Sequence, residues 1–236
     1  MYSFTSRVRY TELNHRKGTM GPYSIINYFQ DCSTFQSEDL NIGLDYLQKQ
    51  NRIWLLTSWQ LHIKKPAVLG DHITIGTWPY AFKGFYGYRN FIMKNDRDEV
   101  LAVADSIWAY LDTRTGTPIR VSEEHSGYTL EAPYPMEHSG RKIKIPEHMT
   151  PCPSFPVVKS NIDSYNHVNN GQYIKMAEEY LPEDFIVSVM RVEYRKQAVS
   201  GDIIHPRVSF GEQNCYISLS DEEEKPYAIM EFVKQQ

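Results

Sequence analysis

The sequence predicts an α+β protein built from two copies of one plan, in which a helix is followed by an antiparallel sheet. Three observations support this prediction. The twelve residues 62–73 recur at 193–204 with six identities and no gap, which is a strong repeat signal for so short a stretch. An apolar pattern with helical spacing precedes each copy. Runs rich in β-branched and aromatic residues, separated by turn residues, follow each helix.

The first copy begins with a helix at Gly21, because Pro22 suits a first helical turn. An apolar stripe at helical spacing follows and indicates a face packed on a sheet. Residues 39–52 have no counterpart in the second copy, so this insertion is expected to add a second helical piece. The stripe consists of Ile25, Ile26, Phe29, Cys32 and Phe35, and the expected strands are 53–63, 73–80, 86–94 and 100–111.

The second copy has a shorter helix that opens near Gly171 and is stopped by Pro182. Its expected strands are 185–195, 203–210, 215–220 and 227–233. Seven of the thirteen prolines lie between residues 112 and 156, which predicts an extended segment over the surface. We therefore expect one unit over 1–135, a linker over 136–152 and a second unit over 153–236.

Composition narrows the classes of function. At 236 residues with 41% hydrophobic content the chain is typical of a globular protein, and a net charge of −4 gives no general case for nucleic-acid binding. No apolar run reaches the ~20 residues of a membrane span, and residues 1–10 lack a signal-peptide layout. Cys32, Cys152 and Cys215 form no metal-binding spacing, and no histidine pair suggests a metal site. This pattern indicates reduced thiols and a cytoplasmic location.

The most informative stretch for function is residues 161–173, where Asp163 precedes His167 by four positions and a short helix follows. A histidine can move protons near neutral pH. The N–H groups at a helix start, here near Asn169, Asn170 and Gly171, can stabilise a developing oxyanion. The structural alternative is that Asn170 caps the helix and Asp163 closes an Asx turn.

This stretch resembles the acyl-acyl carrier protein (acyl-ACP) thioesterase family. The similarity includes His-Val-Asn-Asn at 167–170, the acid at Asp163 and the run 192–197, and it extends over nearly the whole chain through residues 9–13 and 112–116. The resemblance implies a tandem double hotdog fold, in which each unit is a long helix wrapped by an antiparallel sheet. It also implies that the second unit is catalytic and that no cofactor is required.

The chain departs from the family pattern at three positions. Tyr165 stands where the family has asparagine, Gln197 where it has glutamate and Ala198 where it has cysteine. A cysteine nucleophile is therefore disfavoured. Asp163 or His167 could serve as the base that activates water, and the amide of Gln197 could hold the water or the thioester carbonyl.

The resemblance further implies an apolar tunnel in the first unit and a carrier-docking surface near the site. Candidates for the tunnel are Ile25, Phe29, Trp54 and Trp59, although core packing also explains each of them. Acyl carrier protein is acidic and carries its acyl group on a phosphopantetheine arm, so a local basic surface could dock it. The candidates for this surface are Arg191, Arg195 and Lys196, for which ordinary solvated charges are the structural alternative.

The predicted activity is hydrolysis of the thioester of fatty acyl-ACP, which releases a free fatty acid and ends chain elongation. Two alternatives share the fold: an acyl-coenzyme A thioesterase, and a non-catalytic acyl-binding protein favoured by the changes at Tyr165 and Gln197. A hotdog dehydratase is disfavoured because it would want prolines to shape the loop after its histidine, whereas His167 is followed directly by Val-Asn-Asn-Gly. The chain is expected to act as a monomer or a homodimer.

Overall fold

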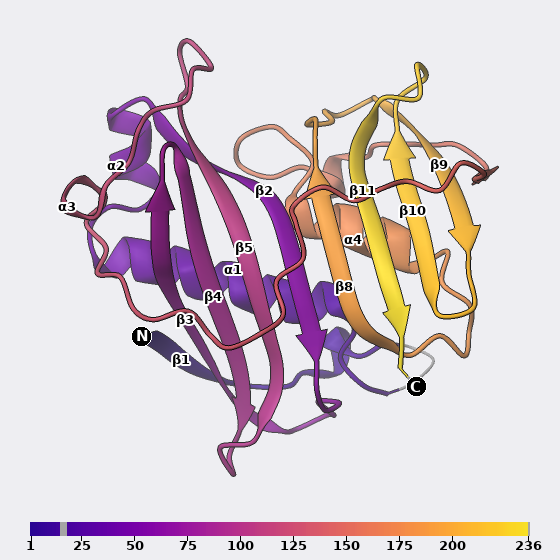
Figure 1. Ribbon diagram of the computed structural model, residues 1–236, viewed down its shortest axis with the longest axis horizontal. Helices are drawn as coiled ribbons and strands as arrows, with labels where there is room; N and C mark the ends of the chain where they lie inside the picture. The colour runs from indigo at the N-terminus through magenta and orange to yellow at the C-terminus, as the bar shows by residue number, and fades with distance from the viewer. Residues whose placement is uncertain (15–17, 236) are drawn as a thin grey trace. The chain divides into compact units, whose positions relative to one another are not determined.

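A computed structural model of the protein describes residues 1–14 and 18–235. The chain divides into two compact units, Met1–Thr57 with Leu61–Ser139 and Ser58–Gln60 with Gly140–Gln236. Each unit contains an antiparallel sheet and one principal helix (Figure 1). The predicted α+β plan is therefore confirmed in both halves.

In the first unit, helix α1 (Pro22–Asp39) begins after an extended Gly21 with proline in its first turn, as expected. Its apolar stripe packs on the sheet, where the Phe29 and Phe91 rings stack at 5.3 Å. Helix α2 (Leu44–Lys49) lies in the predicted insertion. The strands, in spatial order, are β1 (Tyr2–Arg7), β3 (His72–Lys83), β4 (Tyr86–Asn95), β5 (Val100–Asp112) and β2 (Arg52–Ile63).

In the second unit, helix α4 (Asn170–Glu178) contacts strands β10 (Asn214–Ser220) and β11 (Pro226–Lys234). Its apolar face buries Tyr173, Ile174 and Ala177. The strand order is β8 (Val187–Tyr194), β11, β10, β9 (Ile203–Phe210) and β6 (Thr150–Pro151), and β7 (Phe155–Pro156) also pairs with β9.

Two features differ from the sequence prediction. Strand β1 was not predicted, because its polar residues alternate with only two aromatic ones and its pairing with β3 is a long-range contact. The strand predicted for 185–195 ends at Tyr194, because the backbone that follows turns toward helix α4. Gln197 therefore lies in an irregular segment and not on the strand.

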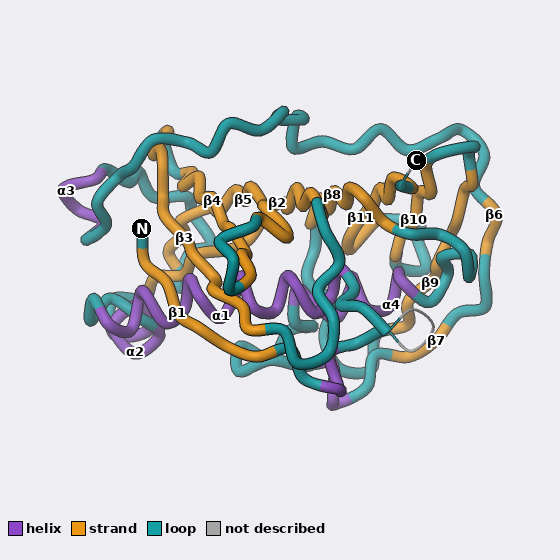
Figure 2. Tube along the Cα trace, turned by 90° about the horizontal axis from the view of Figure 1, so that it is seen from below, coloured by secondary structure: helices purple, strands orange, loops and turns teal. Residues whose placement is uncertain are grey.

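The proline-rich segment is largely irregular and contains only the short helix α3 (Glu123–Ser126) with β6 and β7. In each unit it runs over the sheet face opposite the helix (Figure 2). The Trp78 indole N–H donates to the Ala132 carbonyl at 2.9 Å, and the Ile143 N–H donates to the Glu193 carboxylate at 2.8 Å. Hydrogen bonds of this kind hold the segment on the sheet.

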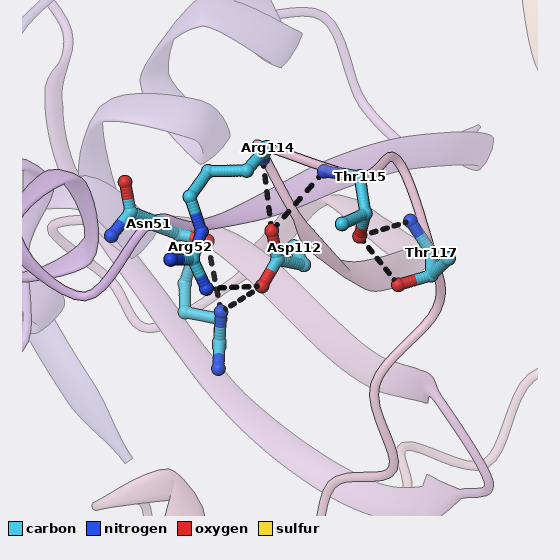
Figure 3. A network of polar contacts seen from close by, with 6 residues as sticks. All are labelled: Asn51, Arg52, Asp112, Arg114, Thr115 and Thr117. Carbon is cyan, nitrogen blue, oxygen red and sulfur yellow. Dashed lines mark hydrogen bonds and ion pairs between the residues drawn. The ribbon is translucent and has the colours of Figure 1, made fainter.

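A polar network closes the end of strand β5 (Figure 3). Oδ2 of Asp112 accepts from Arg52 at 2.6 Å, and Oδ1 accepts from the backbone N–H groups of Arg114 at 2.9 Å and Thr115 at 3.3 Å. The hydrogen bond from the Arg114 N–H is the largest cause that lowers the pKa of Asp112, to about 2. This network fixes the turn from β5 beside the first residue of β2.

The sequence repeat corresponds to a structural repeat. Gly70-Asp71 and Gly201-Asp202 form the same turn, with the glycine at φ of 86° and 93°, a left-handed conformation that favours glycine. In each copy the aspartate Oδ2 accepts from the N–H three residues earlier, that of Val68 at 2.9 Å and that of Val199 at 3.0 Å. The repeated residues are therefore those that build this turn.

Candidate active site

The loop between the 3-10 turn η2 (Lys159–Asn161) and helix α4 is closed by its own backbone. The Asp163 N–H donates to the His167 carbonyl at 2.8 Å, and the Asn166 N–H donates to the Asp163 carbonyl at 3.1 Å. Asn166 adopts φ of 62°, which asparagine tolerates better than most residues. These bonds bring the acid and the histidine side by side at the start of the helix.

The Asp163 side chain also supports the loop. Its Oδ1 accepts from the N–H of Tyr165 at 2.9 Å and from that of His167 at 3.4 Å, which forms the Asx turn given above as the structural alternative. Its Oδ2 accepts no hydrogen bond from any residue in the described part of the chain. One carboxylate oxygen is therefore structural, and the other is available to water or substrate.

His167 contains the most unusual polar atom of the loop. Its Nδ1 is buried and has no hydrogen-bond partner within residues 1–14 and 18–235. Buried polar atoms are almost always paired in folded proteins, so an unpaired one calls for a functional explanation. The neighbouring Val168 is buried and donates its N–H to the Ala198 carbonyl at 2.9 Å.

The start of helix α4 uses two of the three N–H groups expected to form an oxyanion site. Asn169 is the N-cap: its Oδ1 accepts from the Gly171 N–H at 2.8 Å, and its own N–H donates to the Asn161 carbonyl at 2.9 Å. The expectation that Asn170 is the cap was wrong, because the helix begins at Asn170 itself, one residue earlier than that expectation required. The Asn170 N–H donates to no described residue, so it is the one of these three N–H groups that remains available to another acceptor.

Gln197 is exposed and lies three residues beyond the end of β8. The neighbouring Ala198 is bonded on both sides: its carbonyl accepts from Val168, and its N–H donates to the Tyr173 hydroxyl at 2.9 Å. The backbone beside Gln197 thus contacts both the residue that follows His167 and the helix. Tyr165 lies at the tip of the loop and is 36% exposed.

The three cations expected to dock a carrier each have a carboxylate partner in the same unit. Strand alternation also directs Arg191 to the face opposite Tyr194, whose hydroxyl donates to the Asn170 carbonyl at 2.9 Å. The pairs are Arg191 with Glu231 at 2.6 Å, Arg195 with Glu193 at 3.0 Å and Lys196 with Asp221 at 2.6 Å.

The residues expected to line an acyl tunnel lie on helix α1 and strand β2, and one of them, Trp59, falls within Ser58–Gln60 of the second unit. Ile25 and Phe29 are buried on α1, and Trp54 on β2 has its ring 4.6 Å from that of Tyr110. Trp59 is also buried and lies five positions after Trp54 on the same strand. Regular alternation along a strand directs residues at odd separation to opposite faces, so the two tryptophans belong to different surfaces.

The cysteines do not offer a reactive thiolate. Cys32 and Cys215 are buried, and burial raises the pKa of each thiol to about 12. Burial also raises the pKa of Cys152. Since the thiolate is the nucleophilic form, these values agree with the inference from Ala198 that the chemistry uses no cysteine.

The first unit has a corresponding loop ahead of α1, one residue longer between its closing positions (14–19 against 163–167), of which residues 15–17 lie outside the described part of the chain. Ahead of α1, and after the 3-10 turn η1 (Tyr10–Glu12), the Asn14 N–H donates to the Thr19 carbonyl at 2.7 Å. The Gly18 N–H donates to the Asn14 carbonyl at 3.0 Å, and Gly18 has φ of 64°. Asn14 therefore stands in the place of Asp163, and Thr19 stands in the place of His167.

The correspondence continues into the helix and the repeat. The Met20 N–H donates to the Ala67 carbonyl at 2.9 Å, as Val168 donates to Ala198. Pro66 then occupies the place of Gln197. The short matched stretch 62–73 did not reveal this correspondence, but extending the repeat back to the helix starts would have paired these positions.

No helix in the described part of the chain combines the length and apolarity needed to span a bilayer. No three or more His, Cys, Asp or Glu side chains among the described residues are gathered as metal ligands.

A helix and an antiparallel sheet in each unit, with a histidine and an acid ahead of the second helix, define a tandem hotdog protein of the thioesterase class. The model of the acyl-ACP thioesterase N-terminal domain matches residues 2–128, and that of the C-terminal domain matches residues 147–230. The chain therefore belongs to the acyl-ACP thioesterase family.

Curated relatives are similar to part of this chain. The palmitoyl-acyl carrier protein thioesterase of Gossypium hirsutum is 27% identical over 193 residues, which are 71% of this chain and 46% of that protein. Oleoyl-acyl carrier protein thioesterase 1 of Arabidopsis thaliana is 23% identical over 204 residues, 77% of this chain and 56% of that protein. The chain thus spans about half the length of the curated relatives it matches.

Solved structures of low sequence identity share the fold. An acyl-ACP thioesterase from Bacteroides thetaiotaomicron superposes with a TM-score of 0.90 at 17% identity and covers 99% of this chain and 97% of its own. The 12:0-ACP thioesterase from Umbellularia californica gives a TM-score of 0.85 at 14% identity and covers 99% and 96%. The hotdog expectation is thereby confirmed.

Proposed function

We propose that this protein hydrolyses the thioester of fatty acyl-ACP, releasing a free fatty acid and ending chain elongation. Family membership supports the proposal. The observation that carries it is the second-unit loop, where Asp163 and His167 are joined by a backbone hydrogen bond at a helix start. There the carboxylate retains an oxygen without a described partner, and the imidazole has an unpaired Nδ1.

The reaction needs an activated water, a place for negative charge and a proton for the leaving group. Asp163 or His167 takes a proton from water as the oxygen adds to the thioester carbonyl carbon. The Asn170 N–H at the positive end of α4 stabilises the resulting oxyanion. The carbon–sulfur bond then breaks, and the thiolate of the phosphopantetheine arm receives the proton.

Gln197 has a positioning role in this scheme, since its amide can donate and accept but cannot act as a base. Its placement beside Ala198, which is bonded to the residue after His167, brings it to the loop backbone. We propose that it holds the attacking water or the carbonyl. Tyr165, exposed at the loop tip, contacts the substrate's arm.

The acyl chain lies against the apolar face of the first unit around Ile25 and Phe29. Trp54 extends this surface on the same side as Phe91. Its ring centroid lies 6.2 Å from that of Phe82, and the β3–β4 register pairs Phe82 with Gly87. Gly87 and Phe91 are four positions apart on β4 and therefore face the same side of the sheet. Trp59 lies on the other face of its strand. We propose that Trp54 contributes to the tunnel and Trp59 does not.

Acyl-coenzyme A hydrolysis is the second candidate function, and the ion pairs of the expected docking residues favour it. Arg191, Arg195 and Lys196 each pair with a carboxylate, which lowers their attraction for an acidic carrier protein. A coenzyme A thioester has the same phosphopantetheine thiol without that protein. Under this candidate the site chemistry is unchanged.

The test is thiol release from matched acyl-ACP and acyl-coenzyme A substrates of several chain lengths, with His167→Ala as the inactive reference. The proposal expects a higher kcat/KM on acyl-ACP at every accepted length. Preference for coenzyme A would establish the second candidate. Turnover of neither, by a folded protein, would contradict both and favour a non-catalytic acyl-binding role.

A further inference from the structure

The Tyr173 side chain makes a contact that the mechanism above does not use. Tyr173 lies on helix α4 and is 2% exposed, and its hydroxyl accepts the N–H of Ala198, which is fully buried. Burial raises the pKa of Tyr173, so the group remains a neutral hydroxyl at physiological pH. A buried N–H that loses its acceptor is left unsatisfied, which is unfavourable, so this bond is a strong local constraint.

The segment that carries Gln197 is held at both ends. Before it, the Tyr194 hydroxyl donates to the Asn170 carbonyl at 2.9 Å. After it, Ala198 is bonded through its N–H to Tyr173 and through its carbonyl to the Val168 N–H. Residues 195–197 therefore span between two anchors on the helix that begins at the candidate site.

The first unit shows that the hotdog fold does not require the Tyr173 bond. There Ala67 accepts the Met20 N–H as Ala198 accepts the Val168 N–H, and the Gly-Asp turn follows in the same way. Counting from each helix start, however, Ile25 occupies the place of Tyr173, and it has no hydroxyl. The extra bond occurs in the unit that contains Asp163 and His167, beside Gln197 and not beside Pro66.

We infer that Tyr173 is a positioning residue for the hydrolysis, because its hydroxyl fixes Ala198 and thereby sets the position of the Gln197 amide beside the Asp163–His167 loop. The inference rests on the proposed function and deepens it. It assigns Tyr173 no contact with substrate. Its effect on rate passes through residue 197.

The first experiment is a kinetic double-mutant cycle of Tyr173→Phe and Gln197→Ala on one good thioester substrate. Tyr173→Phe is expected to lower kcat by about 10-fold or more, with KM changed by less than about twofold. In the Gln197→Ala background it should cause no further loss. Tyr173→Ile, which installs the first unit's residue, should show the same coupling.

Tyr216→Phe is the matched control. Its hydroxyl donates to Glu231 at 2.7 Å in the same unit and has no bond to the segment 195–198. This variant should keep wild-type kcat. A Tyr173→Phe loss that is equally large with and without Gln197 would show a purely structural role and overturn the inference.

The second experiment needs no substrate. Amide hydrogen exchange of Ala198 should be slow in the wild type and about 10-fold or more faster in Tyr173→Phe, while the Val168 amide stays protected. Unchanged Ala198 protection would overturn the inference. An active wild type with an unaffected Tyr173→Phe variant overturns the inference alone, whereas a wild type inactive on every thioester overturns the proposed function as well.

Discussion

The described residues of the loop ahead of α1 repeat the backbone hydrogen bonds of the loop ahead of α4 but have different side chains. Both follow a 3-10 turn, both are closed by an N–H to carbonyl bond of 2.7 or 2.8 Å, and both contain a left-handed residue, Gly18 or Asn166. In both, the residue before the helix cap donates to an alanine of the repeat. The scaffold is therefore independent of the chemistry that it carries.

At four corresponding positions the two loops and their surroundings have side chains of different chemistry. The second loop has Asp163, His167 and Gln197, with Tyr173 on the following helix, where the first has Asn14, Thr19, Pro66 and Ile25. The residues at the second loop can move protons and donate hydrogen bonds, whereas those at the first loop include no group that titrates near neutral pH. The comparison shows that the two units keep similar backbone hydrogen bonds while only the second has, at these positions, the side chains that the proposed hydrolysis requires.

The largest effect is expected when the second loop receives the first loop's residues. Asp163→Asn combined with His167→Thr should lower kcat by roughly 10²–10⁴-fold, because both proton-transfer groups are removed. Melting should stay near wild type, since the asparagine oxygen can still accept from the Tyr165 N–H. Thiol release from acyl-ACP measures the loss, and each single change should cost nearly as much as the pair.

The reciprocal change serves as the control for this exchange. Asn14→Asp combined with Thr19→His should leave kcat unchanged in the wild type and should restore nothing in the inactive variant, because Pro66 cannot replace Gln197. A double exchange in the second loop that retains half of the wild-type kcat would show that these two residues only shape the loop.

The next effect concerns Gln197. Gln197→Ala should reduce kcat by about 10- to 10³-fold, the cost of losing a positioned hydrogen-bond partner. Gln197→Glu should remain active, but two carboxylates near one water repel, so the pair should hold a proton to higher pH. Its kcat–pH profile should then rise at higher pH than that of the wild type. Wild-type behaviour of Gln197→Ala across the range would place residue 197 outside the site.

A smaller effect, on stability alone, is expected from a histidine and acid pair in the first unit. Asp105 is 8% exposed on the sheet face opposite α1, and its Oδ2 lies 3.7 Å from Nδ1 of His138. Burial raises the pKa of Asp105 to about 6, against the contributions of Tyr80 and His138, which lower it. The Asn90 amide also donates to Oδ1 at 3.2 Å.

The sign of the pH dependence follows from this raised pKa. Between pH 4 and 6 the folded protein binds more protons at Asp105 than the unfolded chain does, so its contribution to the free energy of unfolding falls as pH rises. That free energy for Asp105→Asn, relative to wild type, should increase by about 2 kcal/mol from pH 4 to pH 7.5. Denaturant unfolding at several pH values measures the trend.

Asp98→Asn, which changes an exposed carboxylate of the same unit, is the matched control and should show no such trend. Asp105→Asn should also keep wild-type kcat, since this pair is in the first unit and the proposed site is in the second. A difference that does not depend on pH would mean that Asp105 titrates normally.

The smallest effect is expected from the cysteines. Replacing Cys32, Cys152 and Cys215 together by alanine should leave most of the activity, because no reactive thiolate is present at neutral pH. Loss of kcat must be compared with the fraction of folded protein, as two of the thiols are buried. A fully folded triple variant without turnover would restore a cysteine mechanism.

Much of the fold follows from local patterns. Helices at Pro22 and near Gly171, the inserted helix before Arg52 and eight strands were predictable because apolar periodicity is a property of neighbouring residues. Strand β1 was not, since its six residues are half exposed and pair with β3 only across about 70 positions. The longest strand that was missed is therefore one whose stability comes mostly from its partner; the unpredicted α3, β6 and β7 are each two to four residues long.

The candidate site divides in the same way. Asp163 and His167 were identified by spacing, and the Asx turn between them is a local structure. The cap on Asn169 instead of Asn170 depends on the dihedral angles at the loop end. The neutral pairing of Arg191, Arg195 and Lys196 depends on carboxylates that are distant in sequence or face the same side of a strand.

The sequence by itself determined the α+β plan, the repeat and the Asp163–His167 pair, because each is recognised from the spacing of residues within a short stretch of sequence. Only the tertiary structure decided where Gln197 lies, which N–H groups at α4 remain available and what Tyr173 contacts. Tyr173 and Ala198 are 25 positions apart, and a hydrogen bond over that separation forms only when helix and sheet pack together. The physical reason is that side-chain spacing along a chain fixes periodicity, whereas donors and acceptors find their partners only in the folded state.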